Sequence, residues 1–341
     1  MIWRGPAGWA EWSPFEDYRG AEIVPWLRAA VEQATRTWPE PRRDRIPVNV
    51  TIPVVEPDVA HRLALESGCR TAKIKVAEPG QTPGDDLARV AAVRDALGPE
   101  GKIRIDANGG WDVDEALAAL RELSVFGLEY AEQPCPGVEE LATLRSRLRR
   151  AGIRVPIAAD ESIRRAEDPY RVAELEAADI AILKVQPLGG VRACLEIADQ
   201  IGMPVVVSSA VETSIGIRAG IALAAALPEL PHACGLNTIR LLTDDLGRPP
   251  LIADGGVLPV GDLEIDPVAV DRCTAPDDLD RYWQQRLADT LALAELTADD
   301  LVSPVDGPST SSGPLGRVSG SGSLGGGPSA RSASGIGKDV G

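Results

Sequence analysis

From residue 44 onward, the sequence predicts an α/β fold in which eight parallel strands close into a (β/α)8-type barrel. Short β-rich runs alternate with amphipathic helical stretches, and the strands return at a near-regular spacing. A doubly wound open sheet is the alternative, but no G-x-G-x-x-G follows the first strand, which weakens it. The expected strands are 47–53, 71–76, 102–108, 128–134, 156–162, 180–186, 204–210 and 232–238. The expected helices include 23–37, 85–97, 113–123, 138–148, 168–177, 191–201, 213–227 and 275–296.

The segments before and after the barrel differ from it in composition and in their pattern of predicted elements. Residues 1–43 are rich in Trp and Pro, and residues 8–15 are typical of a strand end followed by a turn. We expect residues 1–43 and 241–302 to pack together as a smaller α+β capping domain against the barrel of residues 44–240. From residue 303 to 341 the chain is mostly Ser, Gly and Pro, a composition that cannot bury enough apolar surface to order itself, so we predict a disordered tail.

Composition limits the classes of partner. The 341 residues contain 35 Lys and Arg against 51 Asp and Glu, and the net charge of −16 argues against nucleic acid or an anionic membrane as partner. Five scattered cysteines without a C-x-x-C suit a reducing cytoplasm and argue against a zinc ribbon or a disulfide framework. The first residues are unlike a signal peptide, and no apolar run approaches the length of a membrane span. We therefore predict a cytoplasmic protein that acts on a small molecule.

Two lysines, Lys73 and Lys75, lie two residues apart in the second expected strand. Side chains alternate faces along a strand, so both ammonium groups project to the same side and repel each other there. A buried strand tolerates this if anions lie opposite, or if one lysine must lose its proton. By itself such a pair more often marks an edge strand facing water, and the residues of the following strands reverse that interpretation.

Three carboxylates, Asp106, Glu132 and Asp160, lie near the ends of the next three strands at equivalent depth. Active sites of parallel barrels lie at these strand ends, and neighbouring strands are only about 5 Å apart, so the three acids should converge. A hard divalent cation would relieve their repulsion. Mg²⁺ fits best, with Mn²⁺ as a substitute, since only two histidines occur in the chain. The alternative is that each acid pairs with a loop arginine.

A single lysine, Lys184, lies on the sixth strand, across the expected barrel mouth from Lys75. A bound Mg²⁺ and the neighbouring Lys73 would both favour loss of the Lys75 proton, so Lys75 is the predicted general base. A metal bound to a substrate carboxylate would stabilise the enediolate that forms when the adjacent carbon loses its proton.

Taken together, these strand-end motifs resemble the muconate-lactonizing subgroup of the enolase superfamily, in which a lysine base works with Mg²⁺. Within it, the chain is most similar to the o-succinylbenzoate synthases of the actinobacterial type, over roughly residues 5–296. The stretches 128–135, 208–214 and 234–238 support this resemblance. The motifs themselves are Lys73-Ile74-Lys75, Arg104-Ile105-Asp106-Ala107-Asn108, Glu132-Gln133-Pro134, Ala159-Asp160-Glu161-Ser162 and Lys184.

The resemblance implies a lyase reaction of menaquinone (vitamin K2) biosynthesis. It would be the Mg²⁺-dependent syn-dehydration of 2-succinyl-6-hydroxy-2,4-cyclohexadiene-1-carboxylate to o-succinylbenzoate. Position by position, it implies metal ligation by Asp106, Glu132 and Asp160, proton transfer by Lys75, and stabilisation of the enediolate by Lys184 through a cation–π contact. It further implies substrate contacts or supporting positions for Lys73, Arg104, Asn108, Ser208, Ser209 and Gly235.

Two features depart from the family. Its members begin with a further strand and a mobile loop that closes over the substrate, whereas Met1 falls almost directly before residues 5–9 here, so either the start lies upstream or part of the lid is missing. The Ser/Gly-rich tail is also foreign to the family pattern.

Other activities on the same scaffold form the alternatives. An N-acylamino-acid racemase or a dipeptide epimerase could use Lys75 and Lys184 on opposite faces of its substrate. Dipeptide epimerases usually carry an Asp-x-Asp at strand eight, which residues 235–238 lack. A lid-less, inactive metal-binding homologue is the third interpretation, and the intact catalytic positions argue against it.

Overall fold

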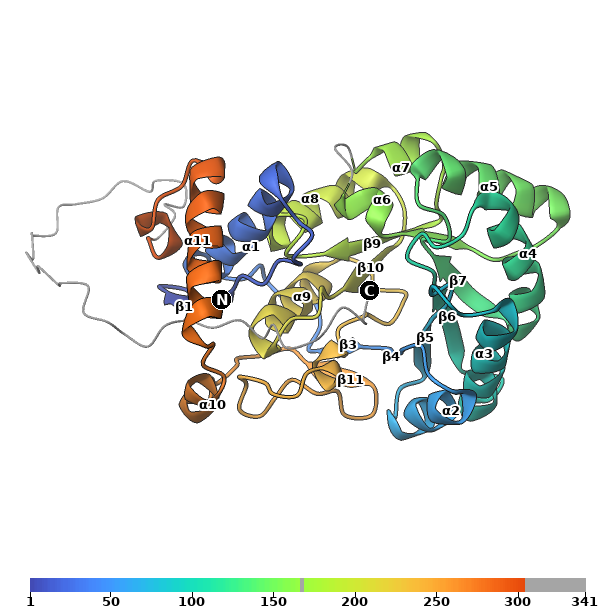
Figure 1. The fold of residues 1–341 in the computed structure, drawn as a ribbon, viewed down its shortest axis with the longest axis horizontal. Helices are drawn as coiled ribbons and strands as arrows, with labels where there is room; N and C mark the ends of the chain where they lie inside the picture. The colour runs from blue at the N-terminus through green and yellow to red at the C-terminus, as the bar shows by residue number, and fades with distance from the viewer. Residues whose placement is uncertain (166–168, 304–341) are drawn as a thin grey trace, which may run out of the picture.

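The computed structural model describes residues 1–165 and 169–303 (Figure 1). The predicted disordered tail, apart from Ser303, lies outside the described residues, as does the first residue of the predicted helix 168–177. Within the described ranges, no helix combines the length and the apolar character needed to cross a membrane.

A curled sheet of seven parallel strands forms the centre of the fold and confirms the predicted fold class. Neighbouring strands follow one another in sequence order from β4 to β10, as in a (β/α) barrel. The strands are β4 (Val50–Ile52), β5 (Thr71–Lys75), β6 (Lys102–Asp106), β7 (Leu128–Glu132), β8 (Ile157–Ala159), β9 (Ile180–Lys184) and β10 (Val205–Ser208).

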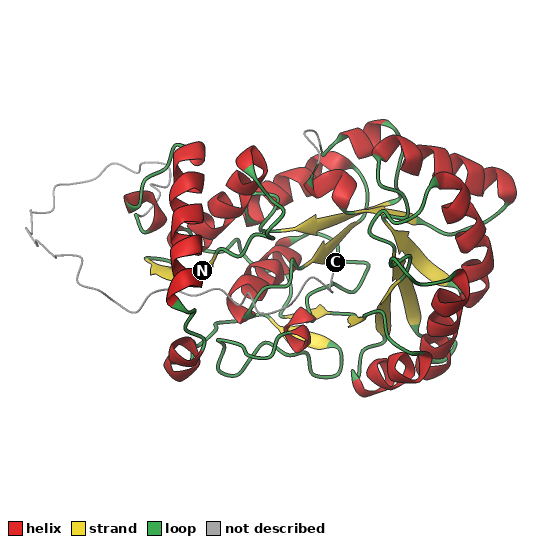
Figure 2. Cartoon of the chain, viewed as in Figure 1, coloured by secondary structure: helices red, strands yellow, loops and turns green. Residues whose placement is uncertain are grey.

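Helices surround this sheet, with α2 to α5 along the outside of β5 to β7 (Figures 1 and 2). Capping residues start several of them: Thr82 accepts a hydrogen bond from the Asp85 N–H at α3, and Asp112 accepts from the Glu115 N–H at α4. The barrel helices are α2 (Pro57–Glu66), α3 (Pro83–Leu97), α4 (Val113–Leu123), α5 (Val138–Ala151), α6 (Glu161–Arg164), α7 (Arg171–Glu174), α8 (Val191–Ile201) and α9 (Ser214–Ala226), with the 3₁₀ turns η2 (Ser124–Phe126) and η3 (Thr238–Leu241).

The predicted eighth strand, residues 232–238, is wrong as a strand, because only two of its residues pair with neighbours. Cys234 N donates to Pro47 O (2.7 Å), and Gly235 N donates to Val207 O (2.8 Å). These contacts join the β10 edge to the β4 edge and close the ring. A Cβ atom at Gly235 would lie 2.5 Å from Ser208 Oγ, so a larger residue at this closing position would displace the Ser208 hydroxyl.

Two further expectations are corrected. The predicted strand 47–53 divides into β3 (Arg45–Pro47) and β4, and β3 pairs antiparallel with β11 (Val257–Pro259) outside the barrel sheet. The break follows Pro47, where the chain changes partner: Val48 N donates to Gly256 O (2.9 Å) next to β11, and Asn49 N donates to Cys234 O (3.0 Å) at the barrel edge. Of the predicted helix 168–177, the described part is helical only over α7.

The capping elements pack around their own aromatic core. The rings of Trp12 and Trp283 meet edge to face at 5.7 Å between centroids, and Tyr18 and Trp26 do so at 5.1 Å. All four side chains are buried. The elements are β1 (Ile2–Gly5), β2 (Gly8–Glu11), η1 (Gly20–Ile23), α1 (Val24–Thr35), α10 (Pro267–Arg272), α11 (Asp277–Ala294) and η4 (Asp299–Leu301), with α11 and α1 side by side in Figure 1.

Two contacts fix the N-terminal segment to distant parts of the chain. The Glu11 carboxylate accepts hydrogen bonds from Thr213 N and from Gly216 N (3.0 Å) at the start of α9. In α11, the Arg286 guanidinium donates to Phe15 O (2.7 Å) and Tyr18 O (3.0 Å). The turn at residues 14–18 is therefore held by the last long helix.

Candidate active site

The strand register places the predicted acids side by side. Asp106 pairs with Lys75 on one neighbouring strand and with Glu132 on the other, while Asp160 follows directly after β8. All three acids are buried, with at most 1% of each residue exposed. The acids therefore converge at the carboxyl ends of β6, β7 and β8.

Three lysines hold these carboxylates in the described conformation. The Lys73 ammonium lies 2.9 Å from Asp106 Oδ2 and 2.8 Å from Glu132 Oε1. Lys75 Nζ lies 3.1 Å from the same Asp106 oxygen, and Lys184 Nζ lies 2.6 Å from Asp160 Oδ2. Charge-assisted hydrogen bonds of this length are strong in a buried site. Lys73 and Lys75 do project to one face, and anions lie opposite them.

The electrostatic environment differs from one acid to the next. Although burial opposes it, the nearby Lys73 and Lys75 lower the pKa of Asp106, and Lys184 and Arg164 likewise lower that of Asp160. Burial, together with repulsion from Asp106 and Asp160, instead raises the pKa of Glu132 to about 7. Burial disfavours the charged form of Lys73, yet its two carboxylate partners raise its pKa well above the usual value.

The donor set fits a divalent cation. Across the described ranges, no three His, Cys, Asp or Glu side chains are drawn into a metal-binding cluster, and ammonium groups occupy the space between the predicted ligands. The Lys73 ammonium nevertheless contacts two of the three carboxylates at once, so a single cation can reach both. Carboxylate oxygens from three rigid strand ends are ligands that suit Mg²⁺.

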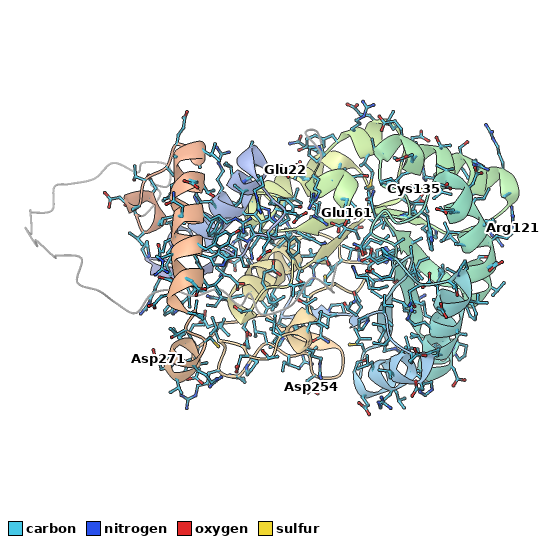
Figure 3. All side chains as sticks on the ribbon, viewed as in Figure 1. Glu22, Arg121, Cys135, Glu161, Asp254 and Asp271 are labelled. Atoms are coloured by element: carbon cyan, nitrogen blue, oxygen red, sulfur yellow. The ribbon has the colours of Figure 1, made fainter. Side chains whose placement is uncertain are left out.

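A cavity of about 560 Å³ opens beside these side chains. Its wall contains most of the predicted site residues: Lys73, Lys75, Asp106, Asn108, Lys184, Ser208, Ser209 and Gly235. Asn108 Oδ1 accepts a hydrogen bond from Lys75 Nζ (2.5 Å), and Asn108 Nδ2 donates to Glu161 Oε1 (3.2 Å). Figure 3 labels Glu161, which lies in the middle of the molecule between the capping helices and the barrel strands.

Three predicted site residues do not line this cavity: Glu132 and Asp160 lie behind the lining residues Lys73 and Lys184, and Arg104 lies farther away. Arg104 is fully buried, one inward-facing position before Asp106 on β6. Its Nε donates to Glu129 Oε2 (2.6 Å), one of its terminal nitrogens donates to Ala233 O (2.7 Å), and its guanidinium carbon lies 4.7 Å from the centre of the Tyr130 ring. Arg104 thus contributes to the barrel interior below the site.

Sequence reasoning missed Arg164, which lines the cavity. Its Nε donates to Asp160 Oδ1 (3.1 Å), a terminal nitrogen donates to Glu161 Oε1 (2.6 Å), and the other contacts the Tyr18 hydroxyl. Asp160 thus pairs with an arginine, as in the alternative weighed above, but this arginine lies on a helix and Lys184 contacts Asp160 as well. Lysines contact Asp106 and Glu132. Arg164 lies four residues after Asp160 on α6, a spacing that could have indicated the contact.

Sequence reasoning expected a lid from the N-terminal segment but did not single out the capping residues that form part of the cavity wall. Phe15, Glu16, Asp17 and Arg19 line the cavity opposite the barrel strands. The guanidinium of Arg165 lies over the Tyr18 ring at 4.4 Å, which joins this segment to the loop after α6.

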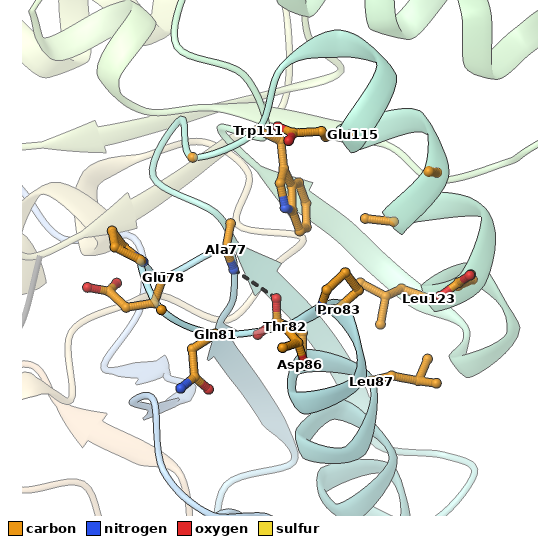
Figure 4. A pocket seen from close by; sticks show the side chains of 16 residues that line it. Ala77, Glu78, Gln81, Thr82, Pro83, Asp86, Leu87, Trp111, Glu115 and Leu123 are labelled. Atoms are coloured by element: carbon orange, nitrogen blue, oxygen red, sulfur yellow. Dashed lines mark hydrogen bonds between the residues drawn. The ribbon is translucent and has the colours of Figure 1, made fainter.

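A second cavity, of about 420 Å³, lies outside the barrel between α3 and α4 (Figure 4). Part of its lining is the loop that follows Lys75, in which Ala77 N donates to Asp86 Oδ2 (2.9 Å), drawn as a dashed line in Figure 4. Next to it, the buried Arg89 donates to the carbonyl oxygen of Lys75 (2.9 Å). None of the predicted site residues lines this outer cavity. The hydrogen bonds made by Asp86 and Arg89 nevertheless hold the end of β5 and the loop that follows it in place.

Comparison with known proteins agrees with this geometry. Residues 57–264 match the model "Enolase C-terminal domain-like", and residues 1–34 match "Enolase N-terminal domain-like". The o-succinylbenzoate synthase of Thermobifida fusca is 56% identical over 298 residues, which are 84% of this chain and 88% of that protein. The chain belongs to the o-succinylbenzoate synthase family of the enolase superfamily. The predicted family is thereby confirmed.

Other members of the o-succinylbenzoate synthase family and of the superfamily are also similar. The o-succinylbenzoate synthase of Mycolicibacterium smegmatis is 51% identical over 291 residues, 85% of this chain and 88% of that protein. Among solved structures, muconate lactonizing enzyme from Pseudomonas fluorescens superposes with a TM-score of 0.64 at 26% identity, covering 75% of this chain and 74% of that one. A dipeptide epimerase from Enterococcus faecalis gives 0.57 at 28% identity, with 65% of each chain covered. The epimerase alternative is therefore not favoured.

Proposed function

We propose that this protein catalyses the Mg²⁺-dependent syn-dehydration of 2-succinyl-6-hydroxy-2,4-cyclohexadiene-1-carboxylate to o-succinylbenzoate, a step of menaquinone biosynthesis. One observation carries the proposal: a chain 56% identical to an o-succinylbenzoate synthase has three converging carboxylates flanked by lysines beside one cavity. The scattered cysteines suit a reducing compartment and support a cytoplasmic location.

Asp106, Glu132 and Asp160 would hold Mg²⁺. The bound cation would neutralise the negative charge that develops on the substrate carboxylate when the adjacent carbon loses its proton. Because the three carboxylates come from three neighbouring strand ends, their positions are set by the sheet and need little rearrangement to bind a cation.

Lys75 would carry the proton. Its Nζ lines the cavity and is oriented by Asn108 Oδ1 and Asp106 Oδ2. It would take the proton from the carbon next to the carboxylate, which breaks that C–H bond. The same ammonium would then protonate the hydroxyl leaving from the same face, so that the C–O bond breaks, a ring double bond forms and water departs. A single lysine serving both steps accounts for the syn geometry.

Lys184 and the small polar residues would complete the substrate site. Lys184 Nζ, held by Asp160, would place a positive charge opposite Lys75 across the cavity. Ser208, Ser209 and Gly235 would face the succinyl chain, since these short side chains leave room on that wall. Lys73 would hold Asp106 and Glu132 in place while Lys75 reacts.

The test is direct. The purified full-length protein is incubated with the cyclohexadiene carboxylate and Mg²⁺, and formation of the aromatic product is followed by ultraviolet absorbance. We expect Mg²⁺-dependent turnover well above the spontaneous rate. A protein that binds Mg²⁺ by calorimetry and yet leaves the substrate at its background rate would refute the assignment.

A further inference from the structure

Gln133 follows Glu132 directly and is fully buried, with 0% of its surface exposed. Its φ of +38° lies in the left-handed region, which residues other than glycine seldom adopt. Such strain persists only where the surrounding structure enforces it, so this position calls for a specific reason.

The backbone of Gln133 connects the ends of three strands. Its N–H donates to Ala158 O (2.8 Å) on β8, and its carbonyl oxygen accepts from Gly109 N (2.7 Å) in the loop after β6. Gln133 itself continues β7. These are the three strands that lead to Asp106, Glu132 and Asp160.

The side-chain amide adds contacts on the β8 side. Its oxygen accepts hydrogen bonds from Asp160 N (3.0 Å) and Ser162 N (3.1 Å), the backbone on both sides of Glu161. Its nitrogen donates to Ser162 Oγ (2.7 Å) and Cys135 O (2.8 Å), the latter bond shared with the more distant Pro136 O (3.4 Å). A carboxamide can accept two hydrogen bonds through its oxygen and donate two through its nitrogen, and Gln133 uses both capacities. No other uncharged side chain of this length can do so.

We propose that Gln133 is a positioning residue, which fixes the backbone of Asp160 relative to Glu132 and Asp106 so that the three carboxylates can bind one divalent cation. The inference rests on the proposed function only for the identity of the cation. It also explains why Gln133 is buried, has a backbone in the left-handed region, and forms hydrogen bonds through both its backbone and its side chain.

The consequence is a specific loss of metal affinity. Mg²⁺ demands near-octahedral geometry, so a shift of one carboxylate weakens its binding. Removal of groups that orient metal ligands typically costs about 10–100-fold in affinity. Gln133→Met keeps the length of the side chain and removes its amide, which leaves Asp160 N, Ser162 N and Cys135 O without this partner. We expect Mg²⁺ to bind about 10–100-fold more weakly to this variant.

Gln33 in α1 provides the matched control. It is also a buried glutamine, 2% exposed, and its amide oxygen accepts from Glu11 N (3.2 Å) in the capping elements. Gln33→Met should lower the melting temperature by a similar mechanism, the loss of a buried hydrogen bond, and leave Mg²⁺ affinity unchanged.

The experiment is a calorimetric titration of the metal-free proteins with Mg²⁺, together with near-ultraviolet circular dichroism to verify the fold. Weaker Mg²⁺ binding by folded Gln133→Met but not by Gln33→Met, with kcat rising again as Mg²⁺ approaches saturation, would support the inference. Wild-type affinity in the folded variant would overturn it. Should Gln133→Met fail to fold, Gln133→Asn keeps the amide but shortens its reach, and the same comparison applies to it. Wild-type protein that binds Mg²⁺ without turnover would refute the proposed function alone.

Discussion

Two layers of charged side chains lie one behind the other inside the barrel. The upper layer contains Asp106, Glu132 and Asp160 with their lysines, and it lines or lies beside the 560 Å³ cavity. The lower layer, defined by Arg104, Glu129 and His232, has no member among the described residues of that cavity wall. Arg104 and the three upper acids are buried, Glu129 and His232 are half-buried, and β6 contributes to both layers through inward-facing positions two residues apart.

The two layers differ most at one acid each, Glu129 in the lower layer and Glu132 in the upper layer. In the lower layer, Glu129 contacts Arg104 (2.6 Å) and His232 (3.1 Å), which lower its pKa to about 2 against the effect of burial. In the upper layer, burial and two neighbouring acids raise the pKa of Glu132 to about 7. Glu129 thus lies between two cationic partners, whereas Glu132 is crowded by Asp106 and Asp160 and is the acid whose repulsion a bound cation would relieve.

Removal of Mg²⁺ should produce the largest difference between the layers. Treatment with a chelator should abolish turnover, because the charge developing on the substrate would no longer be neutralised. Far-ultraviolet circular dichroism should stay near its native value, since the lower layer and the hydrophobic core need no metal. Full recovery on addition of Mg²⁺ completes the test, and turnover that persists in the chelator would contradict it.

Substitution Lys75→Ala should lower kcat/KM at least about 100-fold, because the proton acceptor is lost. The affinity for Mg²⁺, measured by calorimetry, should change little. Lys102→Ala is the matched control, since Lys102 is exposed at the opposite end of β6 and should tolerate the change. Retained activity in Lys75→Ala would exclude this residue as the base.

Substitution Arg104→Met should act on stability more than on chemistry. It removes the guanidinium partner of the half-buried Glu129, which His232 still contacts, so the loss of unfolding free energy should fall below the range of about 3–5 kcal/mol typical of a fully buried pair. We expect a lower denaturant midpoint and a Mg²⁺ affinity close to that of the wild type. A strong loss of Mg²⁺ affinity at unchanged stability would instead place Arg104 in the function of the upper layer.

The lower layer should also make the free energy of unfolding depend on pH. Because the pKa of Glu129 is about 2 in the folded protein and 4.5 ordinarily, its stabilising contribution is present above pH 4.5 and is lost as the pH falls toward 2. This contribution is below about 3 kcal/mol at neutral pH, because solvent screens the charge of a half-buried carboxylate. Denaturant unfolding at several pH values should show a weaker acid dependence for Glu129→Gln than for the wild type. The exposed Glu66→Gln should follow the wild-type curve.

The sequence predicted the upper layer well because strand ends obey a simple rule. Once Lys75, Asp106 and Glu132 are assigned to consecutive parallel strands, their register at one edge of the sheet follows from the fold. The side-chain period of two also indicated that Lys73 and Lys75 share a face.

The features that the sequence did not predict depend on contacts between segments that are far apart in the chain. Closure of the ring through Cys234 and Gly235 involves only two residues, too few for a strand pattern. The place of residues 15–19 in the cavity wall follows from how the capping elements dock on the barrel, which no local pattern specifies. In the sequence, Arg104 and Asp106 are both charged residues expected to face the barrel interior. Only their contacts in the structure show that Arg104 belongs to the lower layer and Asp106 to the candidate site.

The hydrogen bonds from Arg286 to Phe15 O and Tyr18 O affect when the protein can complete its fold during synthesis on the ribosome. These contacts join residues 271 and 268 positions apart in the chain. The barrel strands can pair as they emerge, because each meets its neighbour soon after it is made. The wall formed by the first twenty residues, however, can take its final position only after α11 has left the exit tunnel. A nascent chain should therefore acquire its metal ligands early and its complete substrate cavity only near the end of translation.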